Sequence, residues 1–305
     1  MELHYLKLFH AVAEYESFTK AAEVLHISQP ALSIQIKKLE ESLELKVFDK
    51  IGNRIVLNEN GKTLFTYTQK IFNILDEAEA TLLNKRTEIS GVINVGGSNT
   101  PGTYILPQII GHFKNSYPNV TINLHISTTD EIARRVENGY LDFAVNGGVM
   151  SYNNTIYTEK LIEDPLVIAA SLDCAYTQKE HVTLSELKNL NFIVHESNSQ
   201  LFRTAKTFID SLNAPIEQIR LTLGNIDAIK QAVIANLGVA LIPKSAIMLE
   251  LKLGIIKELM VPDNQLFYPY NLIYNKNKYL SLASKKLIQS VRETITSLHL
   301  DQYQQ

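Results

Sequence analysis

The chain of 305 residues is poor in cysteine, tryptophan and long apolar runs. Its single cysteine, Cys174, cannot form a disulfide within the chain, and a cytoplasmic location is expected. A redox-sensing role and an ordinary structural role both stay open for this residue. No run of about 18 apolar residues occurs, so no membrane-spanning helix is expected. The first 17 residues read as an amphipathic helix and not as a signal peptide, because they lack the long apolar centre that a signal peptide needs.

Positive charge is also scarce. The chain has 29 Lys and Arg residues against 32 Asp and Glu residues, a net charge of −3. Residues 1–62 hold eight basic and nine acidic side chains, a net charge of −1. A protein that binds nucleic acid without regard to sequence is usually more basic. Any nucleic-acid binding is therefore expected to depend on specific contacts by a small face, duplicated in a dimer.

Familiar catalytic motifs are missing. The chain has no P-loop, no G-x-S-x-G and no H-E-x-x-H, and GGSNTPG at 96–102 departs from the G-x-G-x-x-G pattern. The eight histidines show no metal-ligand spacing with Cys174. We therefore expect no catalytic residues, no cofactor and no metal site.

Residues 17–61 carry the most informative pattern, which reads as a short helix, a tight turn, a second helix and a β-hairpin. Ser17 and Ser28 can cap the two helices, and Pro30 falls in the first turn of the second helix, where its missing N–H is tolerated. The second helix has one apolar face at helical spacing, formed by Leu32, Ile36, Leu39 and Leu43. This order predicts a winged helix-turn-helix.

The polar face of the second helix and the hairpin tip suit DNA. Gln and Ser can reach base edges in a major groove, whereas Lys and Arg can reach phosphates or enter the minor groove. The predicted DNA contacts are Ser28, Gln29, Pro30, Ser33, Ile34, Lys37, Lys50, Asn53 and Arg54. The alternative is an amphipathic surface helix followed by a solvated loop.

Residues 59–88 read as one long helix with an apolar stripe at a spacing of roughly 3.5 residues. The stripe consists of Leu64, Ile71, Leu75, Ala78 and Leu82, with Tyr67 and Ile74 beside it. A helix of this length can bury such a stripe only against another helix, a partner chain or its own C-terminal domain. The stripe therefore predicts a packing surface along this helix.

The rest of the chain alternates strands and helices. Strands are expected at 92–95, 120–126, 141–145, 166–170, 192–195, 219–223, 239–242 and 269–274, and helices at 106–115, 130–138, 184–189, 201–212, 226–236 and 280–298. This order predicts two α/β units with parallel sheets, joined by crossings near 164–165 and 267–270.

Ligands of such folds bind beyond the carboxyl ends of the parallel strands. Those positions are rich in hydroxyl, amide and glycine residues, which favour anions near helix N-termini, although the same residues also serve as plain helix caps. Thr129 can cap the following helix, and His195 either donates to a ligand, senses pH, or is a rim histidine. The predicted ligand contacts are Ser98, Asn99, Thr100, Thr128, Thr129, Asn146, Gly147, His195, Ser197, Ser199 and Asn225.

Together these segments resemble LysR-type transcriptional regulators. The N-terminal match covers FTKAAEVLHISQPALSIQIKKLEESLELKVFDK and the wing ending in LNENG. The C-terminal match covers GVINVGGSNT, YILPQIIGHFKNSYPNV, LDFAV and NIDAIKQAVIANLGVALIP. The resemblance implies a winged helix-turn-helix at 1–58, a linker helix at 59–89 and an effector domain at 90–305 that resembles periplasmic binding proteins. It also implies that the linker helix pairs with a second copy across a two-fold axis, which makes its apolar stripe a dimerisation surface. Lobe I of the effector domain would comprise 91–163 and 268–300, and lobe II 164–267.

The resemblance also implies a function. The chain is expected to bind inverted-repeat sites on double-stranded DNA as a dimer or tetramer, to respond to a small anionic metabolite, and to recruit RNA polymerase. Ser98 and Thr100 match the effector-contact positions of the family, and the segment 98–107 is similar to members that govern sulfur or carbon assimilation.

The chain departs from the family pattern at three places. Ile34 stands where Arg is frequent, Lys50 and Asn53 stand where Arg is common, and Asn198-Ser199-Gln200 replaces a frequent Gly-Ser-Gly. Two other functions stay open: a two-lobed solute-binding receptor without a DNA function, and an enzyme or scaffold. Both predict the absence of sequence-selective DNA binding.

Overall fold

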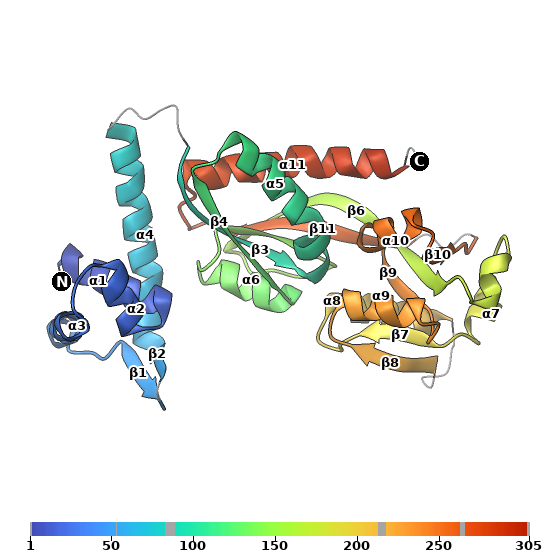
Figure 1. The fold of residues 1–305 in the computed structure, drawn as a ribbon, viewed down its shortest axis with the longest axis horizontal. Helices are drawn as coiled ribbons and strands as arrows, with labels where there is room; N and C mark the ends of the chain where they lie inside the picture. Colours follow the sequence, from blue (N-terminus) through green and yellow to red (C-terminus); the bar gives the residue numbers. More distant parts are fainter. Residues whose placement is uncertain (1, 53, 83–88, 213–217, 263–265, 304–305) are drawn as a thin grey trace. The chain divides into compact units, whose positions relative to one another are not determined.

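The computed structural model describes residues 2–52, 54–82, 89–212, 218–262 and 266–303. The chain forms two compact units, residues 1–87 and 88–305 (Figure 1). In the described ranges no helix combines the length and apolar character needed to cross a lipid bilayer.

The first unit is a winged helix-turn-helix followed by a long helix, as the sequence predicted. Its elements are α1 (Leu3–Tyr15), α2 (Phe18–Val24), α3 (Gln29–Leu43), β1 (Phe48–Ile51), β2 (Arg54–Leu57) and α4 (Glu59–Leu82). The expected caps are present: the Ser17 hydroxyl accepts a hydrogen bond from the Lys20 amide, and the Ser28 hydroxyl accepts one from the Ala31 amide, both at 3.3 Å. His26 adopts a left-handed conformation in the turn, with a φ of +54°.

A buried carboxylate connects α3 to the wing. Glu40 accepts a hydrogen bond from the Val47 amide at 3.0 Å and pairs with Lys46 at 2.6 Å. Leu32, Ile36 and Leu39 of α3 are buried, as the apolar periodicity predicted. The orientation of α3 is thereby fixed relative to the hairpin β1–β2, which pairs Phe48 with Leu57 and Ile51 with Arg54.

Helix α4 packs on α1 through one face. The His10 ring stacks on Phe65 at a centroid distance of 4.9 Å and is hydrogen-bonded to the Thr68 hydroxyl at 3.0 Å. The predicted dimerisation stripe lies elsewhere on α4: Leu64 and Ile71 are half-buried, and Leu75 and Ala78 are exposed. The Leu82 side chain and residues 83–88 of the predicted helix lie outside the described parts.

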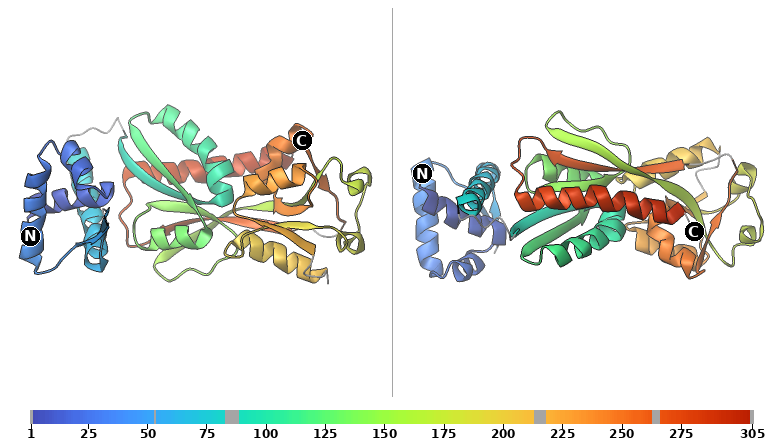
Figure 2. Two further views of the ribbon diagram at one scale, coloured as in Figure 1. Left: turned by 60° about the horizontal axis from the view of Figure 1, so that its bottom comes forward. Right: turned by 90° about the horizontal axis from the view of Figure 1, so that it is seen from above.

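The second unit begins with a βαβαβ segment, as expected. It consists of β3 (Gly91–Ser98), η1 (Pro101–Ile105), α5 (Leu106–Ser116), β4 (Val120–Ser127), α6 (Thr129–Glu137) and β5 (Phe143–Gly147). Strand β3 pairs in parallel with β4 and β5. Helix α5 and the C-terminal helix α11 (Leu282–Tyr303) lie together on one face of this sheet, and α6 covers the other (Figure 2).

Two long strands carry the chain between the lobes. β6 (Ile156–Ser171) and β11 (Leu266–Asn275) pair antiparallel, with a register shift between Tyr270 and Asn271. The predicted crossings at 164–165 and 267–270 both fall inside these strands, so β6 is far longer than the strand expected at 166–170. The first half of β6 is rich in polar residues, so the pattern of apolar residues in the sequence did not predict it as a strand.

The second lobe contains the remaining elements. They are η2 (Ala175–Gln178), α7 (Leu184–Leu187), β7 (Phe192–His195), α8 (Gln200–Ser211), β8 (Ile219–Leu223), α9 (Ile226–Ile234), β9 (Ala240–Pro243), η4 (Lys244–Ile247), α10 (Met248–Lys252) and β10 (Ile256–Leu259). Cys174 is half-buried at the start of η2.

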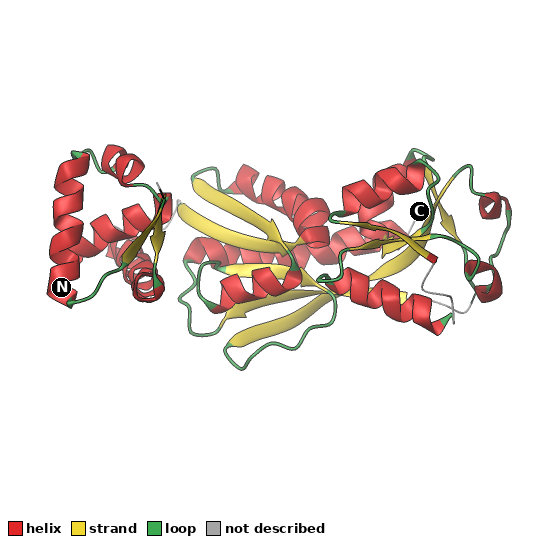
Figure 3. Ribbon diagram, turned by 90° about the horizontal axis from the view of Figure 1, so that it is seen from below, coloured by secondary structure: helices red, strands yellow, loops and turns green. Residues whose placement is uncertain are grey.

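The sheet pairing differs from the expected pair of parallel sheets. In the described residues one seven-stranded mixed sheet has the order β10-β6-β11-β5-β3-β4, and β9 also pairs with β6. Figure 3 shows the strands in yellow with helices packed around them. Strands β7 and β8 form a separate parallel pair. An isolated β-bridge also joins Phe192 of β7 to Val239, the residue before β9. Strand β6 thus belongs to both lobes.

A buried polar cluster holds the crossing strands to η4. The Asp164 carboxylate accepts hydrogen bonds from the Tyr270 hydroxyl at 2.7 Å and from the Ser245 hydroxyl at 2.5 Å. It also accepts one from the Ser245 amide at 3.3 Å. Asp164 and Tyr270 are buried, so these bonds form in a low-dielectric interior.

Candidate functional site

The exposed face of α3 presents a paired amide and hydroxyl. The Gln29 Nε2 group donates to the Ser33 hydroxyl oxygen at 2.9 Å, one turn along the helix. This bond orients the Gln29 side chain and leaves its carbonyl oxygen as an acceptor and its second N–H as a donor. Lys37 follows one turn later, 3.7 Å from Glu41. The predicted contacts Gln29, Ser33 and Lys37 therefore form one strip along α3.

Two other predicted contacts of α3 are apolar and exposed. Pro30 and Ile34 are separated by one helical turn, and 57% of the surface of Ile34 is exposed. Ser28 serves as the N-cap, so its hydroxyl already accepts the Ala31 amide. The helix thus offers a polar strip and a neighbouring apolar strip.

The wing provides a cation near its turn. Lys50 is exposed and pairs in register with Ile55, and Gly52 has a left-handed φ of +62°, as a tight hairpin requires. Asn53 and the Arg54 side chain, both predicted DNA contacts, lie outside the described parts.

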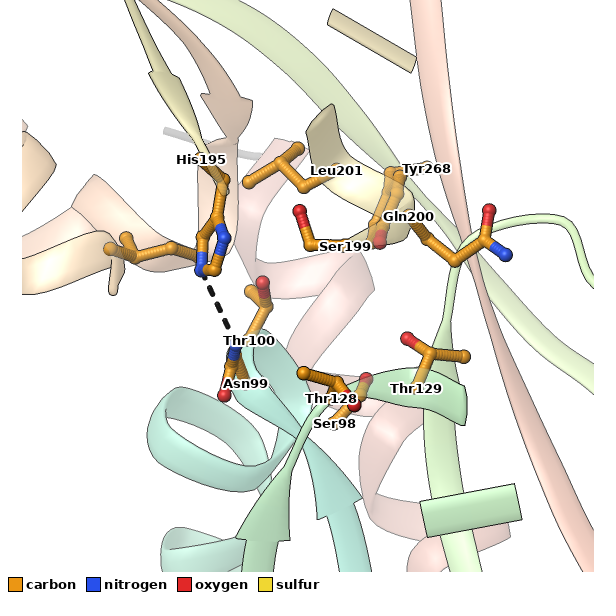
Figure 4. A pocket seen from close by; sticks show the side chains of 11 residues that line it. Ser98, Asn99, Thr100, Thr128, Thr129, His195, Ser199, Gln200, Leu201 and Tyr268 are labelled. Atoms are coloured by element: carbon orange, nitrogen blue, oxygen red, sulfur yellow. Dashed lines mark hydrogen bonds between the residues drawn. The ribbon is translucent and has the colours of Figure 1, made fainter. Parts of the chain in front are cut away.

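A pocket lies between the two lobes of the second unit (Figure 4). It is lined by predicted ligand contacts from four elements or their flanking loops. These are Ser98, Asn99, Thr100, Thr128, Thr129, His195 and Ser199. Its further lining residues were not predicted and are Gln200, Leu201, Ile226 and Tyr268.

The hydroxyls of this pocket differ in how they are used. Ser199 accepts a hydrogen bond from the Phe202 amide at 3.0 Å and donates to the Glu196 carbonyl at 2.9 Å, so it is a fully committed cap of α8. Thr128, not Thr129, caps α6, since its hydroxyl accepts a hydrogen bond from the Glu131 amide. Thr129 instead donates to the Gly147 carbonyl at 3.1 Å.

Ser98 and Thr100 are the hydroxyls best placed for a ligand. Ser98 accepts a hydrogen bond from the Gly147 amide at 2.8 Å, which leaves its own O–H free to donate. Thr100 is buried, and the described residues include no partner for its hydroxyl. Both side chains line the pocket, so each can offer a hydroxyl proton to a bound molecule.

His195 is buried rather than a rim histidine. Only 3% of its surface is exposed, and its Nε2 atom lies 3.3 Å from the Asn99 Nδ2 atom. Burial lowers the pKa of His195, against the opposing effect of the Glu196 carboxylate. If Asn99 donates to Nε2, the proton of the neutral ring sits on Nδ1, which is buried and has no hydrogen-bond partner in the described residues.

Four predicted ligand contacts have other positions. The Asn146 amide donates to the Thr129 carbonyl at 3.2 Å, and the Gly147 peptide is held by Ser98 and Thr129. A side chain at Gly147 would collide with Tyr268, with an added Cβ only 2.5 Å from its ring. Asn225 caps α9 by accepting the Ala228 amide, and Ser197 is exposed outside the lining.

Among the described residues, those that line the pocket include no Lys, Arg, Asp or Glu. Its titratable groups are His195 and Tyr268, and burial raises the pKa of the Tyr268 hydroxyl. The capped N-termini of α6 and α8 meet at the pocket, and the N–H groups there carry partial positive charge. Polar recognition of a ligand would therefore come from hydroxyls, amides and helix ends.

Polar contacts between described residues join the lobes around this pocket. Tyr104 donates to Asp227 at 2.7 Å, Asn99 contacts His195, and Arg203 pairs with Asp130 at 3.4 Å. Lys230, 3.1 Å from Asp227 and 2.8 Å from Glu250, also lies over the Tyr104 ring, 4.6 Å from its centre. Among described residues no three His, Cys, Asp or Glu side chains are grouped to hold a metal ion.

A winged helix-turn-helix on one unit and an interlobe pocket on another define a DNA-binding regulator with a ligand-responsive domain. Comparison with known families agrees. Residues 3–62 match the bacterial regulatory helix-turn-helix protein, lysR family, and residues 86–296 match the LysR substrate binding domain. The chain belongs to the LysR family of transcriptional regulators and is not an enzyme.

Named relatives cover most of the chain. A probable RuBisCO transcriptional regulator of Trichormus variabilis is 33% identical over 297 residues, spanning 95% of this chain and 87% of that protein. The protein of the same name from Phaeodactylum tricornutum is 32% identical over 289 residues, spanning 92% and 93%.

Solved structures show the same fold. A full-length OxyR variant of Pseudomonas aeruginosa has a TM-score of 0.73 at 20% identity, covering 97% of this chain and 94% of that one. Full-length CbnR in complex with its target DNA has a TM-score of 0.65 at 20% identity, covering 96% and 99%.

Proposed function

We propose that this regulator binds inverted-repeat promoter sites as a dimer and changes its DNA complex when a small anionic metabolite binds between its effector lobes. The observation that carries the DNA part is the Gln29–Ser33 pair, oriented on the exposed face of a capped second helix. Each α3 would enter a major groove, with Lys50 on the neighbouring phosphates and with Asn53 and Arg54 as further predicted contacts.

The dimer would form through α4. Tyr67 and Ile74 are 58% and 53% exposed beside Leu75, although all three are large apolar or aromatic side chains. Exposed apolar side chains at helical spacing are typical of a helix that pairs with another copy. Ile74→Glu should place a charge in that interface and shift the mass of the purified chain toward the monomer. Leu253→Glu, on an exposed site of the second lobe, is the matched control.

The effector would be held by Ser98, Thr100 and His195 together with the helix ends of the pocket. Hydroxyl, imidazole and backbone N–H donors carry no full positive charge, but they can replace the hydration shell of a small anion with hydrogen bonds. The described lining residues include no Lys or Arg, so selectivity would rest on the shape of the ligand and on its number of hydrogen-bond acceptors.

The response would follow from lobe closure. A ligand shifts the equilibrium between open and closed arrangements only by its differential affinity for the two. The ligand touches both lobes in the closed arrangement, which therefore gains the larger share of binding energy. The closure would change the spacing of the DNA-binding domains in a dimer or tetramer, and with it DNA bending and contact with RNA polymerase.

The relatives suggest where to look for target genes. Several are named probable RuBisCO transcriptional regulators, so we propose carbon assimilation as the first pathway whose anionic intermediates should be tested as effectors. The proposal rests on about one-third identity and on those names.

The experiment is recovery of sheared genomic DNA by the purified full-length chain at near-physiological salt, followed by sequencing. The proposal expects a few intergenic sites that share an inverted repeat. Uniform recovery, or none, from a sample verified as dimeric would overturn the DNA part. The metabolites of neighbouring genes would then be titrated against a recovered site, and no change in the DNA complex with any of them would argue against the effector part.

A further inference from the structure

One side chain of α3, Ile34, is exposed in a way that the packing of the first unit does not explain. At about 100° per residue, Ile34 lies about 200° around α3 from Leu32, at the centre of the face opposite the buried stripe. It is 57% exposed, whereas Leu32, Ile36 and Leu39 are buried. A β-branched apolar residue at this position contributes little to the packing of the unit and little to helix propensity.

The surroundings of Ile34 make it part of a surface strip. Pro30, one turn earlier on the same side, is also exposed. Gln29 and Ser33 lie beside this strip and are bonded to each other. The first turns of α3 therefore present hydrogen-bonding groups on one line and apolar groups on the next.

The major groove offers few partners for an apolar side chain. Base edges there carry hydrogen-bond donors and acceptors, and the one apolar group is the 5-methyl of thymine. Isoleucine cannot donate or accept, so a hydrogen-bonding edge opposite it would lose water without compensation. A methyl group opposite it would instead gain from the removal of both apolar surfaces from water.

We propose that Ile34 contacts the 5-methyl group of a thymine in each half-site and makes the regulator select that base. The inference rests on the proposed DNA function, and it names a specificity determinant in addition to Gln29 and Ser33. Pro30 extends the same contact toward the start of the helix.

The test removes the methyl group from the DNA. A site is first selected from random duplexes with the full-length chain. Each thymine is then replaced singly by deoxyuridine, and affinity is measured by fluorescence anisotropy for the natural chain and for Ile34→Ala. One thymine in each half-site should lose about fourfold in affinity on replacement, the factor expected for burial of one methyl group. Ile34→Ala should bind the thymine site weaker by at least that factor and show no further loss with deoxyuridine there.

The control and the contrary outcomes are distinct. Val24→Ala, which alters an exposed apolar residue of α2, should keep the sensitivity of the natural chain to deoxyuridine. Additive effects of Ile34→Ala and deoxyuridine at every thymine would overturn this inference while leaving the proposed function intact. Loss of the sensitivity in Val24→Ala as well would also overturn it, because the effect would then be general. Failure to select any site would overturn the proposed function and this inference together.

Discussion

The Tyr104 hydroxyl donates a hydrogen bond of 2.7 Å to the Asp227 carboxylate across the two effector lobes. Tyr104 belongs to η1 in the first lobe and Asp227 to α9 in the second. Burial and this bond raise the pKa of Tyr104. Burial by itself would also raise the pKa of Asp227, but hydrogen bonds from Tyr104 and Lys230 outweigh this effect, so the pKa of Asp227 is lowered. The pair therefore links the lobes through a charged acceptor at the edge of the pocket.

Removal of that bond should loosen the contact between the two lobes. Tyr104→Phe keeps the ring under Lys230 but leaves Asp227 without its hydroxyl donor. We expect faster hydrogen exchange of α9 and η1 amides, corresponding to a loss of about 1 kcal/mol. Tyr176→Phe, whose ring also lies beside a lysine but within the second lobe, should leave both segments unchanged. Equal exchange in the two variants would refute a role in closure.

Thr100→Val should separate effector response from folding. The substitution keeps the shape of the side chain and removes a hydroxyl that has no partner in the described residues. We expect unchanged thermal stability and DNA binding, and effector affinity reduced by about 1–2 kcal/mol if the hydroxyl donates to the ligand. Calorimetric titration measures the loss. Ser197→Ala, on an exposed residue outside the pocket lining, is the control, and a normal affinity in Thr100→Val would exclude the contact.

Gln29→Ala should weaken specific DNA binding. The amide is already oriented by Ser33, so it can meet a base edge with little loss of side-chain entropy. We expect a loss of about 1–3 kcal/mol on the selected site and almost none on random DNA. Gln35→Ala, on the opposite flank of α3, should change neither affinity. Equal losses on selected and random DNA would mean that Gln29 contacts only the backbone.

His10 should make the first unit sensitive to acid. Burial lowers the pKa of His10 to about 4, from an ordinary value of 6.5. The unfolded chain takes up the proton near pH 6.5 and the folded chain does not, so stability is complete above that pH and falls between 6.5 and 4. We expect urea unfolding of the natural chain to lose about 1–2 kcal/mol between pH 7.5 and pH 5 from this group.

A variant identifies the residue responsible. His10→Gln should be less stable at pH 7.5 but should show a smaller loss on acidification. His4→Gln, at an exposed histidine of the same helix, should keep the full dependence. A His10→Gln protein with the pH profile of the natural chain would assign the acid sensitivity to other groups.

Local chemistry explains which elements could be read from the sequence. The Ser17 and Ser28 hydroxyls accept hydrogen bonds from amides only three residues later. The burial of Leu32, Ile36 and Leu39 follows from their spacing at the period of an α-helix. The winged helix-turn-helix and most strands of the effector domain follow from such short-range rules. The hydroxyl-rich strand ends were likewise visible, and seven of the eleven predicted contacts line the pocket.

Tertiary contacts explain what was missed. The π-helical segment Pro101–Ile105 packs closely against β3, where an added Cβ on Gly97 would lie 2.5 Å from the Gly102 Cα. His195 is buried, and its Nε2 atom lies 3.3 Å from the amide nitrogen of Asn99, 96 positions earlier in the chain. Tyr268 reaches the pocket from a strand whose length depends on pairing with β6. No local pattern carries these relationships.

The pairing of β6 with β11 also sets an order of assembly during synthesis. Leu166 pairs with Leu266, one hundred positions later, and Ile156 pairs with Asn275. The first lobe therefore cannot complete its sheet until the whole second lobe has left the ribosome. The helix-turn-helix has no such dependence, because α1 to α4 and the hairpin β1–β2 pack on one another within residues 3–82. A nascent chain would therefore carry a folded helix-turn-helix while its second unit was still incomplete. The edge of β5 would stay unpaired until β11 had been synthesised.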